Sequence, residues 1–230
     1  MTAIVRLAVA LCAALPIPAL AQVYKWIDST GKTQYGDAPP EEARAQPLKI
    51  EAPSGAVGLA EAGVEVAETE ITWFRVGGLT LRELNASKET NGPFNDIAGA
   101  KVWGQTGWRI DWKFAHDRSN GDCRIGRFTV TVESRMWLPK WEQYNLATSE
   151  VRGKWDAFFK GLRIHEDGHK ANGIKAGNDL ARRLRGMTPR GTCEGLNAEI
   201  VQIRERIVSE YSLVDRAFDR VERIYREGLR

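Results

Sequence analysis

The sequence has little cysteine, little histidine and little net charge. Its 230 residues include 3 cysteines and 3 histidines, and 33 basic residues nearly balance 30 acidic ones, which gives a net charge of +3. A protein whose main partner is nucleic acid usually has a basic excess or a clustered basic face. The near balance therefore argues against nucleic acid as the main partner.

Long apolar runs are also missing. A short one, Leu7 to Leu15, follows Arg6 and precedes the small-x-small sequence Ala19-Leu20-Ala21. This arrangement is typical of a secretory signal peptide, and the run is too short to cross a membrane as a helix. We expect residues 1–21 to be cleaved off after Ala21, the mature chain to have no transmembrane segment, and the protein to be periplasmic or secreted.

Cleavage would remove Cys12 and leave two cysteines, Cys123 and Cys193. Bulky Leu11 before Cys12 argues against lipid attachment at that cysteine. In an oxidising compartment an even pair predicts a disulfide bond, and two buried thiols are the alternative. The bond would close a loop of about 70 residues and brace the segment between the two cysteines.

Residues 22–42 predict a small β-hairpin domain. Apolar and polar residues alternate on both sides of the turn sequence Asp28-Ser29-Thr30-Gly31, and Pro39-Pro40 ends the pattern. The spacing Y-K-W-x-D-x-x-G-x-x-x-Y-x-D-x-P-P resembles a short N-terminal domain of unknown function found on bacterial envelope proteins. The resemblance implies a cell-envelope component and no chemistry.

Residues 43–69 are rich in alanine, glutamate, glycine and proline, which predicts a flexible linker. We expect residues 70–230 to form one α+β domain, with an antiparallel sheet followed by a helical half. Alternating apolar residues and β-branched or aromatic composition indicate the strands. The expected elements are strands at 71–76, 101–103, 108–114 and 125–134 and a short helix at 80–86.

Two long helices are expected after the sheet. Apolar residues recur at three- and four-residue intervals between Val151 and Leu184, and again from Leu196 to Tyr225. Gly173 and Gly177 interrupt the first of these patterns, so we expect a break or bend there. The second pattern predicts a C-terminal amphipathic helix.

The first of these helices carries His165-Glu166-Asp167-Gly168-His169, an H-E-x-x-H motif. Positions i and i+4 share one face of a helix, so His165 and His169 can bind one metal ion. Glu166 lies about 100° round the helix and can act as general base towards a water molecule that the metal activates. The alternative is a metal-free pair of buried histidines, which would need partners for four ring nitrogens.

A catalytic zinc site has three protein ligands and one open position. The third ligand stays open between carboxylates: Asp215, Asp219 and Glu222 line one edge of the last helix at i, i+4 and i+7, and Glu194 lies near the start of that helix. Ion pairs with neighbouring arginines are the competing explanation for the acidic edge. His116, in a polar stretch, is expected to be an exposed loop residue.

The chain from residue 71 to 219 resembles a family of secreted zinc-dependent proteases that is otherwise described as a domain of unknown function. The matching features are Gly77-Gly78-Leu79-Thr80, Gly92-Pro93, Trp108-Arg109-Ile110-Asp111-Trp112, Cys123, Leu138-Pro139-Lys140-Trp141, Trp155, the H-E-D-G-H segment and Cys193. The resemblance implies a protease domain over residues 70–230, a Zn²⁺ cofactor, His165 and His169 as ligands and Glu166 as the base.

One part of the chain departs from that family. The family's last helix ends with Y-D-x-x-T-x-H-G, and the aligned residues here run from Phe218 to Tyr225. Asp219 keeps the aspartate, whereas Ile224 and Tyr225 replace the histidine and glycine. Asp219 is thus the first candidate for the third ligand, or it orients a ligand histidine.

Together these features predict a hydrolase: a secreted zinc metallopeptidase that cleaves a peptide or protein substrate with Glu166 as general base. The alternative is a non-catalytic envelope module, with or without a metal, whose tryptophan-rich sheet binds a peptide or a cell-wall glycan. Hydrolysis of an amide bond in cell-wall peptide by the same zinc chemistry is a third possibility.

Overall fold

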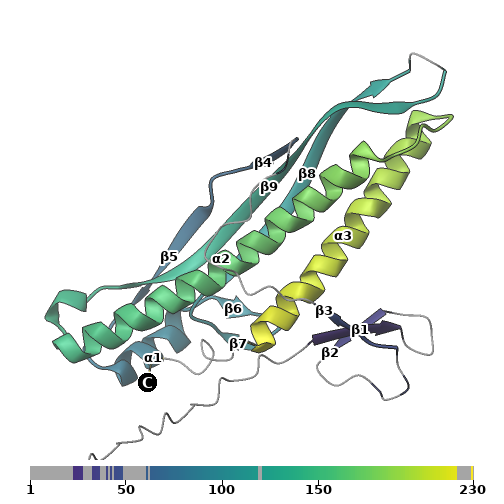
Figure 1. The fold of residues 1–230 in the computed structure, drawn as a ribbon. Coiled ribbons are helices and arrows are strands. Elements are labelled where there is room, and N and C mark those ends of the chain that lie inside the picture. Colours follow the sequence, from purple (N-terminus) through teal and green to yellow (C-terminus); the bar gives the residue numbers. More distant parts are fainter. Residues whose placement is uncertain are drawn as a thin grey trace, which may run out of the picture.

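The computed structural model has an α+β fold, as the sequence predicts (Figure 1). It describes the following parts of the chain: residues 23–27, 33–36, 40, 42, 44–48, 61, 63–118, 121–221 and 229. The expected signal peptide, residues 1–21, lies outside these ranges.

A small N-terminal sheet contains β1 (Val23–Ile27), β2 (Thr33–Gly36) and β3 (Gln46–Leu48). β1 pairs antiparallel with both β2 and β3. The pairing of β1 with β2 is the predicted hairpin. β3 falls in the stretch predicted as a linker, because its three residues are too few to show the alternation of a strand.

The main sheet is built around β9 (Arg124–Trp141). β8 (Gln105–Asp117) pairs antiparallel with it, whereas β5 (Glu70–Val76) and β4 (Val64–Val66) pair with it in parallel. The sheet is therefore mixed, whereas the sequence predicted an antiparallel sheet. Alternation along a strand shows which face is buried but does not identify the partner or its direction.

β4 is a second strand within the predicted linker, and its contacts with the rest of the fold explain why it forms. It is too short to be stable alone. Its backbone pairs with residues 130–132 of β9, and Val64 packs into the core below the sheet. The sequence Val64-Glu65-Val66 carries the alternation, but its surroundings of alanine and glycine obscured it.

Three short elements connect β5 to β8: α1 (Leu81–Asn91), β6 (Phe94–Asn95) and β7 (Ala100–Lys101). α1 is the helix expected at 80–86, and it continues further. The hydroxyl of Thr80 accepts a hydrogen bond from the backbone N–H of Glu83, whose carboxylate accepts in return from the Thr80 N–H. This capping box fixes where the helix begins.

After β9 a single turn of 3-10 helix, Tyr144–Leu146, leads into α2 (Ser149–Arg185). α3 (Cys193–Val221) then returns beside α2, and α2 lies along one face of the sheet against β8 and β9 (Figure 1). α2 begins at Thr148, whose hydroxyl accepts from the N–H of Val151, and ends with arginines in its last turn, which suit the negative end of the helix dipole.

The break expected at Gly173 and Gly177 does not occur, because α2 is continuous across both residues. The glycines instead allow close packing on the sheet. A Cβ atom at Gly173 would lie 2.7 Å from Cγ of Trp108, and one at Gly177 would lie 2.4 Å from Cγ2 of Val132. The helix keeps its hydrogen bonds, and the missing side chains let it approach β8 and β9.

Two apolar clusters form the core between the sheet and α2. The larger one joins β8 and β9 to the second half of α2 and the first half of α3, and the smaller one joins the end of β9 to α1 and the first half of α2. Three tryptophans of the smaller cluster are buried, which supports a packing role for them: Trp103, Trp141 and Trp155.

The disulfide predicted from the cysteine count is confirmed. Cys123, just before β9, is bonded to Cys193 at the start of α3, with 70 residues of separation and 5.1 Å between the Cα atoms. Within the described ranges, no helix is both long enough and apolar enough to cross a membrane.

Candidate metal centre

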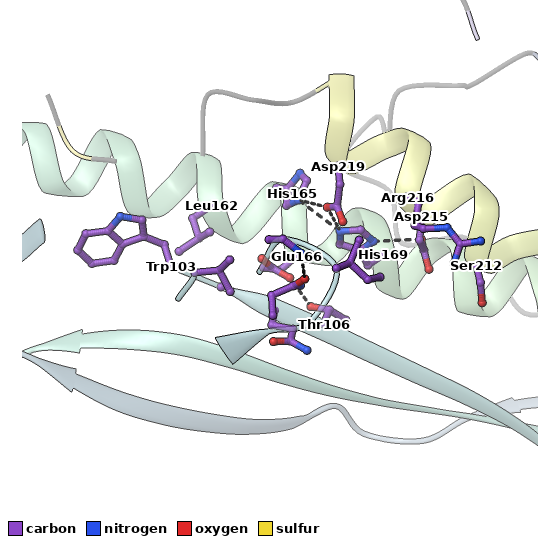
Figure 2. A pocket seen from close by; sticks show the side chains of 16 residues that line it. Trp103, Thr106, Leu162, His165, Glu166, His169, Ser212, Asp215, Arg216 and Asp219 are labelled. Atoms are coloured by element: carbon purple, nitrogen blue, oxygen red, sulfur yellow. Dashed lines mark hydrogen bonds and ion pairs between the residues drawn. The ribbon is translucent and has the colours of Figure 1, made fainter. Parts of the chain in front are cut away.

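The two histidines of the motif lie on the buried face of α2, and each residue keeps 6% of its surface exposed. Asp219, near the end of α3, points at both rings (Figure 2). Its Oδ1 atom is 3.2 Å from Nε2 of His165 and 3.0 Å from Nε2 of His169, and the two Nε2 atoms are 3.3 Å apart. Three atoms of ligand type therefore converge on one point.

These distances fit a zinc ion. Zinc binds histidine nitrogen at about 2.0–2.1 Å, so two ligand atoms of a tetrahedral ion lie about 3.3–3.4 Å apart. The three separations of 3.0–3.3 Å come close to this value. Two imidazoles with one carboxylate also form a donor set that zinc takes at catalytic sites.

Asp215, one turn before Asp219 on α3, holds His169 from the other side. Its Oδ1 is 3.0 Å from Nδ1 of His169 and also accepts from the amide of Asn172 at 2.7 Å, and its Oδ2 accepts from the indole N–H of Trp108 at 2.6 Å. An ionised carboxylate only accepts hydrogen bonds, so Nδ1 of His169 carries a proton and Nε2 faces Asp219. Metal-binding histidines are commonly oriented in this way.

Phe218 packs against both imidazoles. Its ring stacks on that of His165, with centroids 4.8 Å apart and planes 7° from parallel, and it meets His169 edge-on at 5.2 Å. Only 5% of Phe218 is exposed. The ring therefore fixes the orientation of the histidines and keeps water away from one side of the cluster.

Glu166 follows His165 on α2 and has only 2% of its surface exposed. Its Oε2 accepts a hydrogen bond of 2.7 Å from the hydroxyl of Thr106 on β8 (Figure 2). A Cβ atom at Gly104 would lie 2.4 Å from Oε1, so glycine at that position leaves room for the carboxylate. Burial raises the pKa of Glu166, and the positive charge of the nearby histidines only partly opposes this effect.

The charges of the cluster depend on one another. Burial by itself would lower the pKa of His169, but hydrogen bonds to Asp215 and Asp219 outweigh it and raise that pKa to about 10. Burial by itself would raise the pKa of Asp219, yet hydrogen bonds from His165 and His169 hold it well below its usual range. The two aspartates thus favour a positive charge between them, and a proton on Nε2 of His169 competes with a metal cation for that place.

A pocket of ≈ 270 Å³ opens onto these side chains. One wall comes from the segment between β6 and β8, and the other from α2 and the end of α3 (Figure 2). The residues that line it are Asn95, Ile97, Ala98, Val102, Trp103, Gly104, Gln105, Thr106, Leu162, His165, Glu166, His169, Ser212, Asp215, Arg216 and Asp219.

The sequence left three other carboxylates as alternatives for the third ligand: Asp215, Glu194 and Glu222. Glu194 is exposed in the first turn of α3, at the disulfide end of the helix, and Glu222 lies outside the described residues. Asp215 and Asp219 contact the histidines, so pairing with neighbouring arginines does not account for them.

A second group of donor atoms lies at the disulfide end, where His116 is close to Cys123 and Cys193. Both sulfur atoms are used by the disulfide. His116 is exposed as expected, but it lies in β8 rather than in a loop, and a ring nitrogen is 3.1 Å from the amide oxygen of Asn197. The ring of His116 therefore offers the one ligand atom of this group that is still available, whereas the first group offers three.

Four residues that support the site were not identified from the sequence: Gly104, Thr106, Trp108 and Asn172. Trp108 and Asn172 both reach Asp215, and Gly104 and Thr106 both contact Glu166. The sequence held one signal for Asn172. The next residue, Gly173, lies near the buried stripe of the helix, and a glycine there indicates that another element approaches closely.

Comparison with known proteins gives two family matches. Residues 10–62 match a family described as "Domain of unknown function (DUF4124)". No curated protein matches the chain, and no solved structure matches it. Residues 71–227 match a family described as "Bacterial protein of unknown function (DUF922)". This second match spans more than half of the 230 residues and includes the whole candidate metal centre, so the chain belongs to the DUF922 family of bacterial proteins.

Proposed function

We propose that this protein is a zinc-dependent peptidase that acts outside the cytoplasm. The observation that carries the proposal is the triangle of His165 Nε2, His169 Nε2 and Asp219 Oδ1, with sides of 3.0–3.3 Å, beside the buried Glu166. Two imidazoles, one carboxylate and an adjacent buried acid match the ligands and the base of zinc hydrolases. The disulfide supports a location outside the reducing cytoplasm.

A bound zinc ion would supply the Lewis acid that polarises the scissile carbonyl and acidifies a water molecule. His165, His169 and Asp219 would hold it, and Asp215 would keep His169 in the tautomer whose Nε2 is the ligand. Trp108 and Asn172 would in turn keep Asp215 in place. The residues at this end of α3 therefore position the ligands that α2 provides.

Glu166 would take a proton from the attacking water and pass it to the leaving amine. A general base works best when its pKa is close to the working pH, and burial moves the pKa of Glu166 upward in that direction. The hydrogen bond from Thr106 fixes one oxygen, and Gly104 leaves space for the other. The carboxylate is thus held in one orientation at the pocket wall.

Glu166→Gln tests this assignment, because glutamine keeps the shape and removes the base. We expect the hydrolysis of an unstructured protein such as casein to fall by about 10²–10⁴-fold, while elemental analysis finds the same zinc content as in the wild type. Glu205→Gln, an exposed residue of α3, is the matched control and should leave hydrolysis unchanged. Zinc-loaded wild type that binds peptides without cleaving any would instead indicate a non-catalytic binding module.

A further inference from the structure

The pocket has a cationic wall that the chemistry above does not use. Arg216 lines the pocket from α3, and Ser212 lines it one helical turn earlier (Figure 2). No ion pair within 4.0 Å joins Arg216 to a carboxylate of the described residues, although Asp215 precedes it directly. Arg216 and Ser212 therefore present N–H and O–H donors to the same space.

The neighbouring carboxylates explain why Arg216 has no ion pair with the acidic residues that the structure describes. Both oxygens of Asp215 are used, Oδ1 by His169 and Asn172 and Oδ2 by Trp108. Oδ1 of Asp219 faces the two histidines. The acidic side chains closest in sequence to Arg216 are thus directed away from it, towards α2 and the sheet.

The segment between β6 and β8 contributes apolar side chains to the pocket. Ile97, in the segment between β6 and β7, is 67% exposed and lines the pocket, as do Ala98 and Val102. A ligand that fills the pocket would therefore meet an apolar surface on one side and a guanidinium on the other. An amino-acid residue that carries both an apolar side chain and a carboxylate has this distribution of groups.

We propose that Arg216 binds a carboxylate of the substrate and so determines which peptides are cleaved. The proposal rests on the proposed function for the identity of the ligand as a peptide. Guanidinium groups bind carboxylates through two parallel hydrogen bonds, which gives both affinity and orientation. A bound zinc ion and Arg216 would together balance the three carboxylates of Glu166, Asp215 and Asp219, so the site would not repel an incoming anion. The carboxylate is that of a peptide C-terminus or that of an acidic side chain.

Binding of small peptides tests the proposal without relying on turnover. We would titrate the zinc-loaded Glu166→Gln protein by calorimetry with acetyl-leucyl-leucine, with its C-terminal amide, and with the amide of acetyl-leucyl-glutamate. The same titrations would be made with Arg216→Gln and with Arg220→Gln added. Arg220 is exposed one turn further along α3 and does not line the pocket, so it is the matched control.

We expect the free acid to bind at least about tenfold more tightly than its amide, which corresponds to one charge-assisted interaction. Arg216→Gln should remove this preference, and Arg220→Gln should keep it. Tight binding of the glutamate amide as well would identify side-chain carboxylates as a second source of the same group. Equal binding of acid and amide, or a preference that survives in Arg216→Gln because the metal alone holds the carboxylate, would overturn the proposal.

The outcome is independent of the proposed peptidase activity. If the protein holds no zinc, the same titrations are made with the metal-free wild type, and the comparison of Arg216→Gln with Arg220→Gln keeps its meaning. If zinc binds and Glu166→Gln hydrolyses peptides as fast as the wild type, the peptidase mechanism fails while the carboxylate preference is still measured.

Discussion

The two ends of the α2–α3 pair bury different kinds of side chains between the helices. At one end Leu180 and Leu184 of α2 meet Leu196 and Ile200 of α3, and all four are essentially fully buried. A disulfide closes that end between α3 and β9. At the other end the facing residues are histidines and aspartates, and a buried glutamate lies beside them.

The difference indicates that the apolar end stabilises the fold and that the polar end lowers its stability. Burying leucine and isoleucine stabilises the folded chain by about 1.5–3 kcal/mol for each side chain. Burying charged groups costs free energy unless each one is paired, and a well-packed apolar replacement is often as stable or more so. A polar end on an otherwise apolar pair of helices is therefore best explained by a function, and the following experiments test that division.

The largest effect is expected at the apolar end. Replacing both Cys123 and Cys193 by serine should lower the free energy of unfolding by about 4 kcal/mol, because the open chain regains the freedom of a 70-residue loop. Denaturant unfolding measures this loss. Zinc content per folded molecule should stay the same, and a loss of zinc together with the disulfide would show that the two ends are not separate.

The next effect belongs to the polar end. Asp215→Asn removes the charge that holds the proton on Nδ1 of His169 and should weaken zinc binding about 10- to 100-fold. Competition with a zinc-binding dye measures the affinity. Asp179→Asn is the matched control, because Asp179 also accepts a hydrogen bond between α2 and α3, from Tyr211, but away from the metal centre. Equal zinc affinity in the two variants would remove Asp215 from the site.

Two glycines of α2 allow a finer comparison. Alanine at Gly177 would collide with Val132, and alanine at Gly173 would collide with Trp108. Each should lower the free energy of unfolding by about 1–3 kcal/mol. Only Gly173→Ala should also weaken zinc binding, since Trp108 donates to Asp215. Zinc affinity reduced equally by both substitutions would mean that general loosening of α2 is the cause.

A further effect is a dependence of stability on pH in the metal-free protein. The pKa of His169 is raised from 6.5 to about 10, so its contribution to stability is fully present below pH 6.5 and is lost as the pH rises through 10. Denaturant unfolding of chelator-treated protein across this range should show the loss, and His169→Gln should abolish it. The bonded cysteines Cys123 and Cys193 add nothing here, because they do not titrate. A slope that is unchanged in His169→Gln would contradict this assignment.

Much of the fold could be predicted from local patterns. The three-four spacing that predicted α2 and α3 holds because these helices each bury one stripe, and the alternation from Trp108 to Phe114 holds because β8 buries one face. β4 was missed because its pairing with β9 supplies most of its stability. The glycines of α2 were misinterpreted because a glycine that weakens an isolated helix can be favourable where a helix touches a sheet.

The site could be predicted only as far as the sequence spacing reaches. His165, Glu166 and His169 share one helix, so the geometry of that helix brings them together. The other residues of the site come from different elements: Asp215, Arg216 and Asp219 from α3, and Thr106 from β8. Their approach to the histidines depends on how α3 and β8 pack on α2. The acidic edge of α3 was visible in the sequence, but which carboxylate faces which histidine was not.

Metal content is the most direct test of the central claim. The chain from Gln22 onward and its His165→Ala, His169→Ala variant would be purified, supplied with zinc, dialysed and measured by elemental mass spectrometry. The account predicts about one zinc per chain in the wild type and none in the variant, as expected when both histidines are ligands. Wild type without zinc, or a variant that keeps it, would contradict the account.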